Sequence, residues 1–220
     1  MPDRRTVWLF DLDDTLHDAT NASMGELHVS MGAYIEDTLG LNTEEASALR
    51  RRYWLRYGAT LLGLVRHHGV KAAHFLHHTH LLPGLEQRVR GHGADIAALQ
   101  RLRGRKFILT NAPQAYAQRV LGVLGIGHLF EAVISIEDMH MFGDLRPKPD
   151  ARMLRRTAAR LKVHPSRCVL VEDTLVHQKA ARRVGMGTVW MQRWLPAGRH
   201  RPHRRPAYVD RRVSTLRGLL

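Results

Sequence analysis

Two aspartates, Asp11 and Asp13, follow a short apolar run and are the first residues whose type and spacing point to chemistry. Residues two apart in an extended segment project to the same side, so both carboxylates can face one site. Beside a metal-neutralised phosphoryl group, a carboxylate can attack phosphorus in line and form an aspartyl-phosphate. A second carboxylate can protonate the leaving oxygen and later deprotonate the attacking water. The pair is therefore a candidate for two-step phosphoryl transfer.

Other reactive side chains follow later apolar runs in the same way. They are a hydroxyl and an amide, a cation in a proline-flanked loop, and a second acidic pair: Thr110, Asn111, Lys148, Glu172 and Asp173. Carboxylates with no Cys or His beside them suit a hard cation such as Mg²⁺. Such a cation, together with Lys148, would stabilise charged phosphate oxygens, and the Thr110 hydroxyl can hold one of them. This set predicts a site for a phosphorylated substrate.

The elements that must position these residues alternate between strands and helices. Short apolar, β-branched runs predict strands over residues 6–10, 106–109, 132–136, 168–171 and 188–191. Helical patterns fall between them, over residues 94–102, 114–124, 150–161 and 176–184. This alternation predicts a parallel sheet covered on both faces, with ligands bound outside the carboxyl ends of the strands. We therefore expect the reactive side chains at one edge of the sheet.

A long helical stretch, residues 21–80, interrupts the alternation after the first strand. Thr43, followed by Glu44 and Glu45, is typical of a helix N-terminus, with Thr43 as the capping residue. The predicted fold is a doubly wound, Rossmann-like α/β core of residues 1–17 and 89–220. A helical domain of residues 18–88 is inserted into it.

In this order, Asp11-Leu12-Asp13-Asp14-Thr15, Thr110, Lys148 and Glu172-Asp173 resemble the four motifs of the haloacid dehalogenase (HAD) superfamily. The resemblance extends over residues 11–191. It implies that Asp11 is the nucleophile and a metal ligand. It also implies that Asp13 is the general acid and base, with its backbone carbonyl on the metal.

The same resemblance implies roles for the other motif residues. Thr110 and Asn111 would bind phosphoryl oxygens, and Lys148 would neutralise the nucleophile and the phosphate. Asp173 would complete the Mg²⁺ shell, with Glu172 binding the ion directly or through water.

The helical insertion resembles the C1-type cap of this superfamily, which closes over the site and selects the substrate. Residues 52–58 and 62–67 are similar to the cap of its pyrimidine 5′-nucleotidase branch. In that branch, Tyr57, Arg66 and His67 would be candidates for selecting the substrate. His177 stands where the branch has Asn.

These observations favour a Mg²⁺-dependent phosphomonoesterase that acts on small phosphate esters, first of all pyrimidine nucleoside 5′-monophosphates. One alternative is a phosphatase or phosphomutase of the same fold for another metabolite, such as a sugar phosphate, phosphoglycolate or pyridoxal phosphate. Another is a dehalogenase, which would need neither a metal nor Asp13. A third is a non-enzymatic protein that binds nucleic acid through basic residues.

The net charge is +14, and residues 193–220 contribute eight arginines and one aspartate to it. No aromatic residue interleaves with the arginines of residues 199–206, and no nucleic-acid-binding motif accompanies them. We therefore expect a solvated basic tail, not a nucleic-acid site. The excess charge can still attract small anionic substrates.

The remaining features concern the compartment and the histidines. The single cysteine, Cys168, indicates a reducing compartment, and there is neither a signal-peptide pattern nor an apolar run of membrane-spanning length. We therefore expect a cytoplasmic protein, and the oligomeric state stays open.

His74, His77 and His78 share one helical face and could hold a metal, but no Cys or carboxylate lies nearby in sequence. A polar surface is the favoured interpretation.

Overall fold

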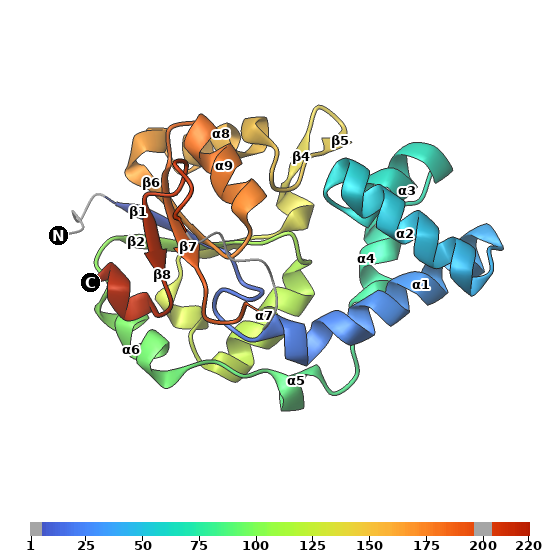
Figure 1. The fold of residues 1–220 in the computed structure, drawn as a ribbon, viewed down its shortest axis with the longest axis horizontal. Helices are drawn as coiled ribbons and strands as arrows, with labels where there is room; N and C mark the ends of the chain where they lie inside the picture. The colour runs from blue at the N-terminus through green and yellow to red at the C-terminus, as the bar shows by residue number, and fades with distance from the viewer. Residues whose placement is uncertain (1–5, 196–203) are drawn as a thin grey trace. The chain divides into compact units, whose positions relative to one another are not determined.

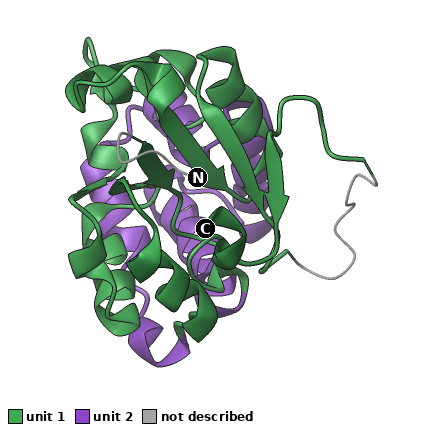
Figure 2. Cartoon of the chain, turned by 90° about the vertical axis from the view of Figure 1, so that its left-hand side faces the viewer, with its two compact units in different colours: residues 1–20, 89–220 green, residues 21–88 purple. Residues whose placement is uncertain are grey.

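The structure, a computed structural model, describes residues 6–195 and 204–220. The chain divides into two compact units (Figure 2). The helical unit is formed by residues 21–88, and the core unit by the segments before and after them. Within the described ranges, no helix has the length and apolar character to cross a membrane. That the helical unit acts as a cap stays a prediction.

The core unit is built on a six-stranded sheet in which every neighbouring pair is parallel. In spatial order the strands are β3 (Ala132–Ile134), β2 (Arg105–Leu109), β1 (Val7–Phe10), β6 (Cys168–Glu172), β7 (Gly187–Met191) and β8 (Arg211–Val213). The predicted α/β fold with a doubly wound parallel sheet is confirmed.

Strand β1 lies in the middle of this sheet, and all four of its side chains are buried. Leu9 is in register with Phe107 of β2 and with Leu170 of β6. A central strand of a parallel sheet is covered on both faces, which is why its sequence is continuously apolar. The strands β2, β1 and β6 therefore end side by side, at the edge where the reactive residues follow.

Four helices cover the sheet: α6 (Gly93–Arg101), α7 (Gln114–Leu124), α8 (Ala151–Arg160) and α9 (Leu175–Arg183). Helices α8 and α9 lie on one side of the sheet, and α6 and α7 on the other (Figure 1). Helix α8 begins where Asp150 accepts hydrogen bonds from the backbone N–H groups of Arg152 and Met153. Asp150 is thus the capping residue of a helix whose predicted range included it.

A short antiparallel hairpin, β4 (His140–Met141) and β5 (Asp144–Leu145), was not predicted. Each strand has only two residues, too few for an alternating pattern to be visible in the sequence. Its turn holds Phe142 and Gly143, both with positive φ, at 52° and 83°. The hairpin lies between the third strand and the loop that carries Lys148.

Of the expected basic tail, residues 199–206, the structure describes residues 204–206, where Arg204 and Arg205 are exposed, and the segment after it packs onto the core unit. Strand β8 pairs with β7, and Val209, Leu216 and Leu219 are buried. The buried carboxylate of Asp95 ties this segment down, because it accepts hydrogen bonds from Thr215 Oγ1 and Leu216 N, both at 2.7 Å. Residues 199–203 of the expected tail lie outside the described residues.

The helical unit contains α1 (Gly25–Leu39), α2 (Thr43–Tyr57), α3 (Thr60–His68), α4 (Ala72–Thr79) and the single turn α5 (Leu85–Arg88). A π-helical turn, Thr20–Met24, precedes α1. The predicted helical stretch is interrupted at Gly40, Gly58 and Gly69, whose φ values of 66°, 78° and 64° end α1, α2 and α3. A left-handed glycine at this position is a common helix stop.

The capping residue of α2 is Asn42, and the prediction of Thr43 is wrong by one position. Asn42 Oδ1 accepts a hydrogen bond from Glu45 N at 3.0 Å, and Glu45 Oε2 accepts one from Asn42 N at 3.1 Å. This reciprocal pair satisfies two backbone N–H groups that the helix itself leaves without partners. Thr43 becomes the first residue of the helix.

Candidate active site

The reactive residues of the core unit meet at the carboxyl ends of three neighbouring strands. Asp11 follows β1, Thr110 follows β2, and Glu172 ends β6 with Asp173 directly after it. Lys148 reaches the same place from the loop before α8. All five side chains are buried. Residues that are far apart in sequence thus form one compact polar cluster inside an apolar core.

Lys148 is the cation at the centre of this cluster. Its Nζ lies 2.7 Å from Asp11 Oδ1 and 2.7 Å from Glu172 Oε2, and the lysine side chain is 2% exposed. Burial alone would lower the pKa of Lys148, but the charges of Asp11 and Glu172 outweigh it and hold that pKa above its ordinary value. The lysine is therefore charged and joins the two carboxylates.

Asn111 fixes the position of Lys148 through its main chain. Asn111 Nδ2 donates to the carbonyl oxygen of Lys148 at 3.0 Å, and the N–H of Lys148 donates to Asn111 Oδ1 at 2.9 Å. Both the oxygen and the nitrogen of the side-chain amide are therefore hydrogen-bonded to Lys148. The Asn111 side chain positions the loop of Lys148, a role that the sequence did not indicate. Its predicted phosphate contact stays a prediction.

Three carboxylates of the cluster, Asp11, Glu172 and Asp173, offer ligand atoms within 4.8 Å of one another. Burial, followed by the neighbouring charge of Glu172, raises the pKa values of both Asp11 and Asp173 well above the ordinary range. Burial acts in the same direction on Glu172, but Lys148 and then His177 reverse it and hold its pKa well below the ordinary value. Among the described residues, the three carboxylates of this cluster share one lysine ammonium, which bridges Asp11 and Glu172.

These donors fit a divalent cation such as Mg²⁺. All three are carboxylates, the oxygen ligands that hard cations prefer, and the set contains neither a sulfur nor an imidazole ligand. Burial, and then repulsion from Glu172, raise the pKa values of Asp11 and Asp173, and the charge of a bound cation would act against both effects. The cluster could therefore hold the metal that the sequence predicted.

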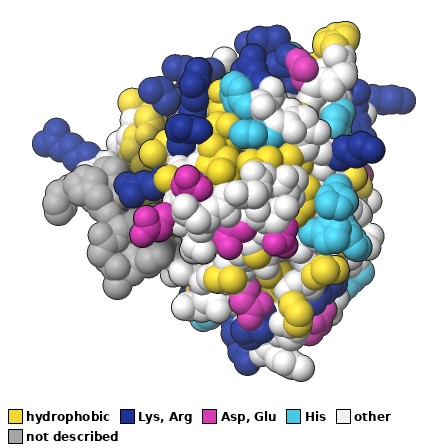
Figure 3. Space-filling model, turned by 90° about the vertical axis from the view of Figure 1, so that its right-hand side faces the viewer, with side chains coloured by type: hydrophobic (Ala, Val, Ile, Leu, Met, Phe, Trp, Pro, Cys, Tyr) yellow, Lys and Arg dark blue, Asp and Glu magenta, His cyan; other side chains and the backbone are white. Residues whose placement is uncertain are grey.

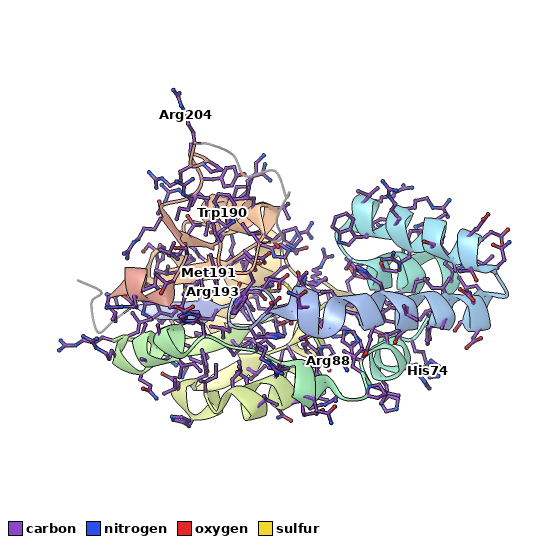
Figure 4. All side chains as sticks on the ribbon, turned by 60° about the horizontal axis from the view of Figure 1, so that its bottom comes forward. His74, Arg88, Trp190, Met191, Arg193 and Arg204 are labelled. Carbon is purple, nitrogen blue, oxygen red and sulfur yellow. The ribbon has the colours of Figure 1, made fainter. Side chains whose placement is uncertain are left out.

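Side chains that the sequence did not single out support Glu172 and Asp173. Gln178 Nε2 donates to the carbonyl oxygen of Glu172 at 2.9 Å. Trp190, in β7 (Figure 4), donates its indole N–H to the carbonyl oxygen of Asp173 at 2.8 Å. His177 Nδ1 lies 3.0 Å from Glu172 Oε2, so the residue that replaces Asn still contacts the acidic pair. The hydrogen bonds from Gln178 and Trp190 fix the main chain of the acidic pair.

Thr110 stands at the end of β2 with only 1% of its surface exposed. Its Oγ1 accepts a hydrogen bond from the N–H of Ala112 at 3.0 Å. A hydroxyl oxygen that accepts in this way still has its own hydrogen to donate. Thr110 therefore has the chemistry to bind an anionic oxygen at the strand end.

Asp13 lies in the turn after β1, and its side chain is 21% exposed, compared with 8% for Asp11. Asp14, at φ 53°, shapes this turn, because its carboxylate accepts from Thr20 N at 2.8 Å and from Thr20 Oγ1 at 2.6 Å. Two carboxylates with the spacing of nucleophile and acid thus have different surroundings: Asp11 is bound to a cation in the interior, and Asp13 lies nearer to solvent.

The three candidates for selecting a substrate lie together within the helical unit. Tyr57 Oη is 2.5 Å from His67 Nε2, and the Arg66 guanidinium lies 6.0 Å from the centre of the Tyr57 ring. They combine an aromatic face with basic groups. Their contact with a substrate stays a prediction.

The other histidines of this unit gather on its surface (Figure 3). Tyr34 Oη is 2.8 Å from His74 Nδ1, and the rings of His74 and His78 are 4.2 Å apart. Among the residues that the structure describes, only Asp11, Glu172 and Asp173 bring three possible metal ligands together. That the histidines form polar surface stays a prediction.

A family model described as haloacid dehalogenase-like hydrolase matches residues 6–185. The chain belongs to this HAD-like hydrolase family. Its match begins at Thr6, just before β1, and ends just after α9, so it includes every residue of the acidic cluster and Lys148. The nucleotidase branch within the family is not identified by this match.

Curated relatives of this HAD-like hydrolase include two phosphatases. One is the fructose-1-phosphate phosphatase YqaB of Escherichia coli, 35% identical over 80 residues, which are 36% of this chain and 40% of the relative. The other is a phosphoglycolate phosphatase of Cupriavidus necator, 31% identical over 106 residues, 48% of this chain and 41% of the relative. The chain thus matches less than half of the length of each.

Among solved structures, a HAD phosphatase from Thermococcus onnurineus is similar to this HAD-like hydrolase with a TM-score of 0.63 and 21% identity. The similarity covers 97% of this chain and 95% of the other. It shows a shared fold over nearly the whole chain.

Proposed function

We propose that the protein is a phosphomonoesterase that hydrolyses a small organic phosphate through an aspartyl-phosphate on Asp11. The observation that carries this proposal is the Lys148 bridge between Asp11 and Glu172, at 2.7 Å to each, in a buried cluster of carboxylates. A lysine in this position orients one oxygen of Asp11 and supplies positive charge that attracts an anionic group to the site. The family match supports hydrolytic chemistry.

In the first step, a carboxylate oxygen of Asp11 attacks phosphorus opposite the ester oxygen, which leaves with the bonding electron pair. Asp13 gives its proton to that leaving oxygen, so the product departs as an alcohol. The Lys148 ammonium and the Thr110 hydroxyl stabilise the negative charge on the phosphoryl oxygens. The product of this step is an acyl-phosphate on Asp11.

In the second step, Asp13 takes a proton from a water molecule, whose oxygen then attacks phosphorus. The bond between Asp11 and phosphorus breaks, and inorganic phosphate leaves with the Asp11 carboxylate restored. One residue serves as acid and then as base, which fits the greater exposure of Asp13 compared with Asp11.

We also propose Mg²⁺ as the cation of this site, held by Asp11, Asp173 and Glu172, the last directly or through water. When bound, it supplies positive charge that offsets the repulsion between the Asp11 carboxylate and an incoming phosphate. The excess of buried carboxylates over the single lysine supports this assignment.

For the substrate, we propose a phosphorylated metabolite of the sugar-phosphate or phosphoglycolate class, because two of the matching phosphatases are named for such compounds. A second candidate is a pyrimidine nucleoside 5′-monophosphate. The cluster of Tyr57, Arg66 and His67 supports it, because an aromatic ring and basic groups suit a base and a phosphate. The cytoplasmic location remains our expectation from the single, buried Cys168.

A phosphate-release panel tests the proposal. It compares fructose 1-phosphate, phosphoglycolate, pyridoxal phosphate, UMP and CMP, each with Mg²⁺ and with EDTA, for the native chain and for Asp11→Asn. We expect Mg²⁺-dependent release from at least one ester and none from Asp11→Asn. Transfer of the phosphate to a second hydroxyl instead of water would indicate a phosphomutase. Release of halide from a haloacid that survives EDTA would replace the proposal with carbon chemistry.

A further inference from the structure

The carboxylate of Asp13 is held by two aromatic side chains of the core unit. Tyr116, in α7, donates its hydroxyl hydrogen to Asp13 Oδ1 at 2.8 Å, and His17 Nε2 lies 2.9 Å from the same oxygen. Tyr116 is 3% exposed and His17 is fully buried. Two buried groups from different segments therefore converge on one oxygen of a partly exposed carboxylate.

The hydrogen-bond partners decide which nitrogen of His17 carries hydrogen toward Asp13. His17 Nδ1 is buried and has no hydrogen-bond partner in the part of the chain that the structure describes. A hydrogen on Nδ1 would be buried without an acceptor, whereas one on Nε2 has Asp13 Oδ1 within reach. The imidazole therefore donates from Nε2, and Oδ1 accepts both from this N–H and from the Tyr116 hydroxyl.

A purely structural role does not explain this arrangement. An apolar side chain at position 17 would fill the same buried space and would leave no ring nitrogen without a partner. Tyr116 likewise carries a hydroxyl in a buried position, where it donates to Asp13 Oδ1. What both polar groups achieve is to fix the rotation of the Asp13 carboxyl group.

We propose that His17 and Tyr116 are positioning residues for Asp13, and that they direct its other oxygen, Oδ2, toward the reacting phosphoryl group. This inference rests on the proposed function. With Oδ1 accepting from the two rings, the acid proton sits on Oδ2. It passes to the ester oxygen as the bond between that oxygen and phosphorus breaks. Water later returns a proton to Oδ2 as its oxygen bonds to phosphorus and the bond between the Asp11 oxygen and phosphorus breaks, which restores the Asp11 carboxylate.

The dependence on the leaving group separates this role from a general loss of structure. An aryl phosphate such as p-nitrophenyl phosphate expels an oxygen that needs no proton, whereas an alkyl phosphate requires one. Formation of the phosphoenzyme should therefore depend on the position of Asp13 only with the alkyl ester. Steady-state turnover mixes this step with the later use of Asp13 as a base, so the first turnover is the informative measurement.

The experiment uses the full chain in the presence of Mg²⁺, with the enzyme in excess over the substrate. Release of the alcohol is followed by rapid quench. The variants are Tyr116→Phe, which removes one hydroxyl, and His17→Leu, which removes the imidazole. His17→Gln restores a donor in nearly the same place, and Asp13→Asn serves as the reference for loss of the acid. Circular dichroism and thermal unfolding establish that each variant is folded.

We expect Tyr116→Phe and His17→Leu each to slow alcohol release from the alkyl ester by about tenfold or more, with the aryl ester changed by less than about threefold. His17→Gln should recover most of the loss on the alkyl ester. Equal slowing of both esters, or no slowing of either, in folded variants would overturn the inference. These results differ from a failure of the proposed function, in which the native chain releases no phosphate or Asp11→Asn remains active.

Discussion

The side-chain amide of Asn111 binds both the N–H and the carbonyl oxygen of Lys148, at 2.9 and 3.0 Å. The two residues lie 37 positions apart, on different loops of the core unit. A single amide thus fixes the main chain that carries the lysine of the acidic cluster. The placement of Lys148 thus depends on a residue that bonds to its main chain and not to its ammonium group.

Replacing Asn111 with Ala should therefore impair catalysis more than stability. We expect kcat for phosphate release to fall by about ten- to a hundredfold, because displacement of a charged group by about 1 Å has effects of this size. Steady-state kinetics and circular dichroism would measure the two effects. The matched control is Asn42→Ala, which removes the cap of α2 and should cost about 1 kcal/mol of stability with kcat unchanged. Equal kcat in the native chain and Asn111→Ala would show that the amide is dispensable.

Stability should depend on pH and Mg²⁺ together. The pKa values of Asp11 and Asp173 are raised in the folded protein by burial and by Glu172, so the stability that they contribute is present at low pH. It is lost as the pH rises above the ordinary value of 3.8 and through the raised pKa values. Glu172, with its lowered pKa, contributes in the opposite direction, but only below its ordinary value of 4.5.

In EDTA, unfolding by urea should therefore show lower stability at about pH 7.5 than at about pH 5. Mg²⁺ should raise the stability more at the higher pH, where the carboxylates are charged and can bind it. The same measurements on Asp173→Asn, which removes one of the two carboxylates with a raised pKa, should show a stability that depends less on pH and less on Mg²⁺. A stabilisation by Mg²⁺ that is equal at the two pH values would contradict the assignment of these carboxylates.

Much of the fold was predictable because its strands are buried on both faces. Strand β1 is continuously apolar and β6 is apolar up to Glu172, so Asp11, Glu172 and Asp173 could be placed at one edge by the geometry of parallel sheets. Strand β8 was missed because Arg211 and Arg212 dominate its three residues. Its stability comes from tertiary contacts that no local pattern records.

The positioning residues of the site could not be predicted from the sequence for a similar reason. Tyr116 and Asp13 are 103 positions apart, and their contact exists only once α7 is packed on the sheet. His17 carried a weak local signal, since it lies four residues after Asp13, but a histidine at that spacing has many uses. Motif positions can be read one at a time, whereas the residues that orient them require the folded structure.

The C-terminal segment should depend on the buried Asp95. Its carboxylate also binds Arg193 Nε at 2.5 Å, in addition to Thr215 and Leu216. Asp95→Ala leaves a partly buried guanidinium without its partner, so we expect a loss of about 3–5 kcal/mol and faster hydrogen exchange at Leu216. Urea unfolding and exchange mass spectrometry would measure both. Asp144→Ala, which breaks an exposed pair with Arg146, should cost no more than about 1 kcal/mol.

The helical unit offers a matched pair of glycines. A Cβ atom at Gly63 would lie 2.1 Å from Tyr53 Cγ, so α3 approaches α2 at a distance that only glycine allows. Gly63→Ala should destabilise the protein by about 1–3 kcal/mol through overpacking. Gly32→Ala, where a Cβ meets only Glu36 Oε1 at 4.0 Å, should instead stabilise α1 by about 0.5–1 kcal/mol. Thermal unfolding of the two variants would decide, and a neutral Gly63→Ala would contradict this packing.

The most direct measurement is chemical trapping of the enzyme during turnover. Rapid acid quench, followed by borohydride reduction, converts an aspartyl-phosphate into homoserine, which peptide mass spectrometry can locate. With a substrate found in the phosphate-release panel, we expect homoserine at position 11 in the native chain and none in Asp11→Asn. Turnover without modification at this position, or modification of a different residue, would contradict the proposed mechanism.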